Sequence, residues 1–181
     1  YQFSKYMNNS FKFINAVHKS KKNNIKMRAY WRSRGWDSNA MVLNKYPSLA
    51  SPSNSDIYTE IDKSKMVVID FLGTTMLELL SLKKPFLLLL DLELLEPSKE
   101  FLNFIEILKN HNILFETPEQ IAEYVNNVDW EINHSVSYNN LIDDLKNTFA
   151  LVDNNWETIW IKRMSQIIKT VKDDELYKKS C

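Results

Sequence analysis

The sequence has little cysteine and no long apolar run, and these shortages exclude several classes of protein. A single cysteine, Cys181 at the last position, excludes an internal disulfide framework and is compatible with a reducing compartment. The longest apolar run, residues 86–90, is far too short to cross a bilayer, and residues 1–20 are too polar for a signal peptide. We therefore expect a cytoplasmic protein without a transmembrane segment, whose contact with the inner face of a membrane is at most peripheral.

The sequence also has no excess of charge of one sign. Lys and Arg number 23, as do Asp and Glu, so nothing in the composition indicates a nucleic-acid partner. His18, His111 and His134 are scattered without the spacing of a zinc site, and the acidic residues within 91–96 share no ligand geometry. No Ser-His-Asp or Cys-His pattern is present. We expect no metal ion and no cofactor, and a solvated loop at residues 91–96.

The length bounds the domain organisation. A chain of 181 residues fits one domain of ordinary size, or one half of a two-domain enzyme. Hydrophobic residues make up 44% of it, which is enough for a real core. Because the chain begins with Tyr1 rather than Met, we expect a fragment of a longer protein, with residues 1–181 forming a single domain.

Helical spacing and short apolar runs alternate along the chain, which predicts an α/β domain with a parallel sheet. The run at 86–90, FLLLL, is typical of a strand covered on both faces. Asp37, Asp56 and Thr117 each precede a helical pattern and are predicted to cap it, the last in a capping box with Gln120. We expect strands at 25–31, 66–69, 86–90 and 113–115, and helices at 3–17, 37–46, 57–63, 74–82, 97–110, 118–127, 137–150 and 155–171.

Glycine is scarce as well, and one of the two glycines, Gly73, stands between a predicted strand and a predicted helix. At such a place the helix N-terminus presents free N–H groups to a phosphate. Gly73, Thr74 and Thr75 would then donate to a diphosphate, and the Glu78 carboxylate would accept from ribose hydroxyls. The alternative is that a threonine caps the helix and Glu78 completes a capping box. Asp70 either orients a ligand or simply ends the strand.

A second candidate loop, residues 31–37, surrounds the other glycine. Arg28, Tyr30 and Trp36 accompany it, and guanidinium groups beside aromatic rings suit a phosphate with a stacked base or sugar. The alternative is a basic, exposed turn with one aromatic side chain buried beneath it. Both loops follow predicted strands, and ligands of open parallel sheets bind at the carboxyl ends of strands.

Five blocks follow one another along the chain, at residues 28–36, 67–85, 99–108, 113–119 and 156–160. Taken in this order, they resemble a family of bacterial transferases of surface-carbohydrate biosynthesis, related to the C-terminal halves of GT-B glycosyltransferases. The most specific block is VVIDFLGTTMLELLSLKKP, which resembles the pattern D-x-x-(G/S)-T-T-x-x-E followed by a proline. Many GT-B members have two or three glycines there, whereas this chain has Phe71 and Leu72 before Gly73. The other blocks are Arg28-Ala29-Tyr30 with Gly35-Trp36, residues 99–108, residues 113–119, and Trp156 with Trp160.

The resemblance implies a three-layer, Rossmann-like domain that forms one half of a GT-B fold, with residues 137–171 as closing helices. It implies that Gly73, Thr74 and Thr75 face the diphosphate of a nucleotide-sugar donor, that Glu78 faces the ribose, and that Arg28 stabilises the leaving group. An N-terminal domain outside this chain would bind a polysaccharide or lipid-linked glycan acceptor and would supply the catalytic base. The alternatives are a nucleotide-sugar epimerase, a polyol-phosphate transferase, or a non-catalytic scaffold of the same architecture.

Overall fold

The computed structural model describes residues 2–29, 37–52, 55–94, 99–128 and 136–149, together with residues 158, 161, 162 and 164–166. In these residues a three-stranded parallel sheet has the order β1-β2-β3, formed by β1 (Val67–Ile69), β2 (Phe86–Leu89) and β3 (Leu114–Phe115). Helix α5 (Thr74–Ser81) joins β1 to β2, and α6 (Lys99–Asn110) lies between β2 and β3 in the chain. The expected α/β class with parallel strands joined through helices is confirmed.

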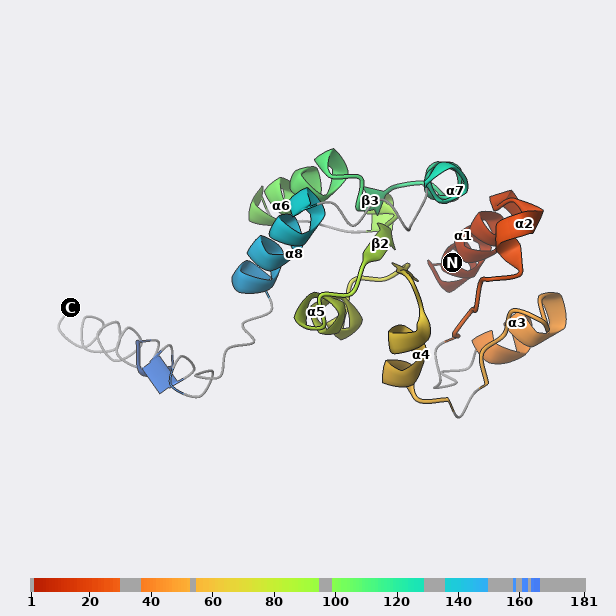
Figure 1. The fold of residues 1–181 in the computed structure, drawn as a ribbon, viewed down its shortest axis with the longest axis horizontal. Coiled ribbons are helices and arrows are strands. Elements are labelled where there is room, and N and C mark those ends of the chain that lie inside the picture. Colours follow the sequence, from red (N-terminus) through yellow and green to blue (C-terminus); the bar gives the residue numbers. More distant parts are fainter. Residues whose placement is uncertain are drawn as a thin grey trace, which may run out of the picture.

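The central strand β2 separates two hydrophobic cores. Phe86, Leu88 and Leu90 belong to a core shared with α5, α6 and α8 (Val136–Phe149). Leu87 and Leu89 belong to a second core, shared with α1 (Gln2–Ala16) and α7 (Pro118–Asn127). Because successive side chains of a strand point to opposite faces, this run is buried on both sides. Helices therefore cover both faces of the sheet, as in a Rossmann-like domain (Figure 1).

Local capping sets the starts of three helices as predicted. The Asp37 carboxylate accepts from the Ala40 amide at the start of α3 (Ser38–Lys45), and the Asp56 carboxylate accepts from the Thr59 amide at the start of α4 (Ile57–Lys63). Thr117 and Gln120 form the predicted capping box of α7. Each cap satisfies amide groups that the first turn of a helix leaves without a partner.

The ends of α1 and α7 are fastened together by polar contacts. The Asn126 side chain accepts from the His18 amide at 2.8 Å and donates to the Ala16 carbonyl at 3.1 Å. Lys21, in the short helix α2 (Lys19–Lys22), donates to the carbonyls of Val125, Asn126 and Val128 at 2.8–3.0 Å. These are carbonyls at the C-terminal end of α7, where a cation is favoured by the helix dipole.

Two local predictions are wrong. A strand was expected at 25–31, but within residues 25–29 only Met27 forms a bridge, in parallel with Ala50. The segment that pairs with Met27, residues 49–51, is short. A turn precedes it, in which the Leu49 amide donates to the Tyr46 carbonyl, and Pro52 follows it, so little extended chain is available for pairing. The second concerns residues 19–24, where the sequence predicted no helix and the structure has α2.

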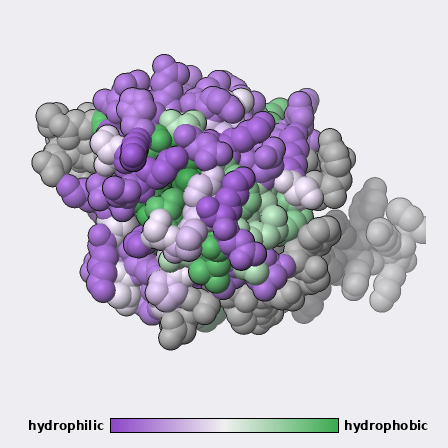
Figure 2. All heavy atoms as spheres, turned by 90° about the vertical axis from the view of Figure 1, so that its right-hand side faces the viewer, coloured by the Kyte–Doolittle hydropathy of each residue, from purple (hydrophilic) through white to green (hydrophobic). Residues whose placement is uncertain are grey.

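The face that carries α1 and α3 is largely hydrophilic, with apolar residues gathered mainly in its central part (Figure 2). The predicted closing helix at 137–150 is confirmed as α8, whereas most of the segment 155–171 lies outside the described residues. Among the helices that the structure describes, none combines the length and the apolar character needed to cross a bilayer.

Candidate functional site at the carboxyl ends of the strands

The turn between β1 and α5 has the predicted strand–turn–helix form. Gly73 is the N-cap of α5, and no side chain caps this helix. Thr74 and Thr75 therefore lie in the first turn, so the alternative in which a threonine caps the helix and pairs with Glu78 is wrong. Thr74 is exposed and Thr75 is half-buried. The amides of Thr74 and Thr75 thus belong to the N-terminal turn of α5, where a helix leaves N–H groups without intrahelical partners.

The conformation of Gly73 does not itself require glycine. Its φ of −163° and ψ of −166° are extended backbone, which any residue adopts. A Cβ added at Gly73 would lie 3.4 Å from two ring atoms of Phe71, an ordinary van der Waals distance. What the glycine supplies is therefore an uncovered approach to the helix N-terminus rather than an otherwise forbidden backbone angle.

Glu78 lies further along α5 and has a partner that the sequence did not indicate. The Tyr58 hydroxyl, on the first turn of α4, donates to Glu78 Oε1 over 3.3 Å. The Glu78 carboxylate raises the pKa of Tyr58, because its negative charge disfavours a phenolate beside it. Tyr58 is 51% exposed, so an aromatic ring stands at the surface next to the predicted ribose-binding carboxylate.

Asp70, the residue that follows β1, is bound by α1. Its carboxylate accepts from Ser10 Oγ at 2.7 Å and from the Tyr6 hydroxyl at 3.0 Å. Burial raises the pKa of Asp70, an effect that these two hydroxyl donors partly offset. Burial also raises the pKa of Tyr6, together with the nearby Asp70 charge. The carboxylate therefore fastens α1 to the end of β1.

Arg28 is held by the segment that leads into α4. Its Nη1 donates to the Ser55 carbonyl at 2.8 Å and to Ser55 Oγ at 2.9 Å, and lies 3.4 Å from Glu60 Oε2. Tyr30 and Trp36, the aromatic residues predicted beside Arg28, lie outside the described residues. The structure thus gives Arg28 protein partners, and the longest of its three contacts is the one with a carboxylate.

A further ion pair links α1 to the end of β2. Lys5 Nζ lies 2.7 Å from Asp91 and 2.8 Å from Glu93, where the sequence predicted a solvated loop. Glu93 is almost fully exposed, but the Asp91 side chain is only 15% exposed. Within the described part of this region, both Lys5 and Arg28 are thus paired with carboxylates, and the turn at Gly73 offers neutral donors.

Comparison with known proteins gives the class of reaction. A family model described as LIC12162 family transferase matches residues 1–164. The chain belongs to this family. No curated protein and no solved structure matched it. The family therefore establishes a transferase, and it includes the β1–α5 turn, Tyr58 and Asp70 within the matched residues.

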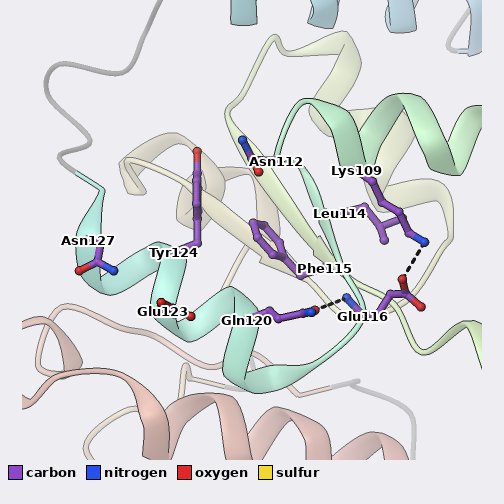
Figure 3. A pocket seen from close by; sticks show the side chains of 9 residues that line it. All are labelled: Lys109, Asn112, Leu114, Phe115, Glu116, Gln120, Glu123, Tyr124 and Asn127. Carbon is purple, nitrogen blue, oxygen red and sulfur yellow. Dashed lines mark hydrogen bonds and ion pairs between the residues drawn. The ribbon is translucent and has the colours of Figure 1, made fainter.

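This LIC12162 family transferase has a separate hollow that the sequence did not indicate, with a volume of about 490 Å³. The hollow lies over β3 and one side of α7 (Figure 3). Its rim groups bind one another: Lys109 Nζ lies 2.6 Å from Glu116, and Gln120 Oε1 accepts from the Glu116 amide at 3.3 Å. It is lined by Lys109, Asn112, Leu114, Phe115, Glu116, Gln120, Glu123, Tyr124 and Asn127, none of which is a predicted site residue.

The turn between β1 and α5 offers different groups to a ligand from those of the hollow. Among the described residues, no group of three His, Cys, Asp or Glu side chains could hold a metal ion. The turn offers hydrogen-bond donors at Gly73 and the following threonines, with the Glu78 carboxylate as an acceptor nearby. Such an arrangement suits a ligand with an anionic part and hydroxyl groups.

Proposed function

We propose that this chain is the donor-binding domain of a transferase that moves a sugar, or a sugar-like group, from a nucleotide-activated donor to a cell-surface polysaccharide. The observation that carries the proposal is the uncapped start of α5 at the carboxyl end of a parallel strand, in a member of a transferase family. Ligands of open α/β sheets bind in this position. The donor diphosphate lies against the amides of Gly73, Thr74 and Thr75, and the ribose hydroxyls bind Glu78.

In the proposed reaction the protein acts by stabilising charge. Negative charge builds on the leaving diphosphate, and preoriented amide donors at a helix N-terminus stabilise it without reorganisation. Arg28 adds to this by exchanging its 3.4 Å contact with Glu60 for a phosphate oxygen. The acceptor and its base belong to a second domain, as in one half of a GT-B fold.

The experiment is calorimetric titration of the chain with UDP, GDP, CDP and inorganic pyrophosphate. We expect saturable binding of at least one nucleoside diphosphate, weakened at least tenfold by Glu78→Ala, because the ribose loses its acceptor. Pyrophosphate has no ribose, so its affinity should stay within about twofold in the same variant. Glu119→Ala is the matched control, since Glu119 is an exposed glutamate in the first turn of α7. No binding of any nucleoside diphosphate would overturn the proposal.

A further inference from the structure

Tyr58 is an aromatic residue that the hydrophobic core does not use. Two other residues of α4, Ile57 and Ile61, pack into the core formed with α5, α6 and α8. Tyr58 is instead 51% exposed, and its hydroxyl reaches sideways to Glu78 on α5. The Tyr58 ring is therefore a large aromatic group at the surface, turned toward a carboxylate of the candidate site, and the packing of the core does not account for it.

The segment that carries Tyr58 is firmly held. Asp56 caps α4 through the amide and hydroxyl of Thr59, at 2.8 and 2.9 Å. Arg28 also binds the Ser55 carbonyl and hydroxyl, just before the start of α4. A tyrosine side chain has only two rotatable angles before its ring, so a ring on such a backbone loses little conformational freedom when it binds a ligand.

We propose that Tyr58 stacks against the nucleoside ring of the ligand whose diphosphate lies at the start of α5. This inference rests on the proposed function, because it needs the ribose at Glu78. The Tyr58 hydroxyl contacts Glu78 Oε1, so the tyrosine ring lies directly beside the place of the ribose, and the base is the part of a nucleotide attached there. The 3.3 Å bond is long and exposed, so ribose hydroxyls replace it at little cost.

The test separates the ring from the hydroxyl and the nucleoside from the phosphates. Tyr58→Leu removes the ring, Tyr58→Phe removes only the hydroxyl, and Tyr124→Leu is a matched control in the hollow beside β3. Each variant is titrated with UDP, GDP, CDP and inorganic pyrophosphate. Stacking of a base on an aromatic ring corresponds to about 5- to 150-fold in affinity. We expect Tyr58→Leu to lose that much for nucleoside diphosphates, Tyr58→Phe less than about threefold, and neither to change pyrophosphate binding.

Three outcomes overturn the inference. If the unmodified chain binds nucleoside diphosphates and Tyr58→Leu binds them equally well, the stacking is refuted while the proposed function stands. If Tyr58→Leu loses pyrophosphate by the same factor, or Tyr58→Phe falls as far as Tyr58→Leu, the side chain supports the site by some means other than stacking. If the unmodified chain binds pyrophosphate, and binds none of the nucleoside diphosphates more tightly than pyrophosphate, both the nucleoside site and the proposed donor class are refuted.

Discussion

Replacing Gly73 by serine should stabilise the protein and weaken its binding of nucleoside diphosphates. The N-cap position has extended dihedral angles of −163° and −166° that serine adopts, and its Cβ would meet the Phe71 ring at 3.4 Å, an ordinary contact. The serine hydroxyl can accept from an amide of the first turn, which has no side-chain cap at present. The same hydroxyl then competes with a phosphate for that amide, and its Cβ obstructs the approach.

The magnitudes follow from these contacts. Serine exceeds glycine as an N-cap by a few tenths of a kcal/mol, and alanine is worse than either, so we expect the stability order Ser, Gly, Ala over a range of about 1 kcal/mol. For a chain of this length, 1 kcal/mol corresponds to about 2–4 °C in Tm. A hydrogen bond to a charged group is worth about 1.5–3 kcal/mol, so losing one at a phosphate should lower the affinity about 10- to 150-fold.

The assay pairs urea denaturation with calorimetric titration of UDP, GDP and CDP. Thr117→Ala is the control, because it removes the N-cap of α7 and should lower stability by about 1 kcal/mol without changing the affinity. If Gly73→Ser lost more than 1 kcal/mol of stability, the inference from the extended backbone and the open Cβ position would be refuted. If Gly73→Ser kept its stability and full affinity, the ligand would not lie against these amides.

Two further predictions concern stability. Burial raises the pKa of Asp70 above 3.8, so the folded state disfavours its charged form, and stability should fall as the pH rises from 3.8 through the folded-state pKa. Asp70→Asn should remove that fall. In urea denaturation between pH 4 and pH 8, the free energy of unfolding of the variant should therefore rise relative to that of the wild type as the pH increases; a constant difference between the two free energies would contradict the assignment. Lys21→Met should cost about 1–2 kcal/mol, because three carbonyls at the end of α7 lose their donor. Lys22→Met, on the same short helix, is its control, and equal unfolding midpoints for the two variants would show that the Lys21 contacts contribute nothing.

The features that could be predicted from the sequence depend on residues close together in the chain. Asp56 caps α4 through Thr59, three residues away, and Thr117 pairs with Gln120 at the same spacing. Their geometry is fixed by one turn of helix, so the residue types are sufficient to locate it. The burial of β2 on both faces was equally clear, because five consecutive apolar residues leave no polar face for solvent.

The features that could not be predicted join residues far apart in the chain. Ser10 reaches Asp70 over 60 positions, and Lys5 reaches Glu93 over 88. No local pattern marks such a pair, because a serine or a lysine on a helix has the same sequence signature whether it faces solvent or a distant carboxylate. The strand expected at 25–31 failed for a related reason, since a strand requires a neighbour, and residues 49–51 provide a single bridge.

The polar contacts that fasten the ends of α1 and α7 together have a consequence for the order in which the protein folds during synthesis. These contacts join residues 104 to 110 positions apart, so α1 leaves the ribosome long before the carbonyls and the Asn126 amide that hold it exist. Chains are made from the N-terminus at roughly 5–20 residues per second, which leaves α1 without α7 for several seconds. Phe13 and Ile14, which share the second core with α7, lack that part of their cover during the interval. Released chains truncated before residue 118 should therefore leave α1 more open to proteases than chains that include residue 128 and can form these contacts.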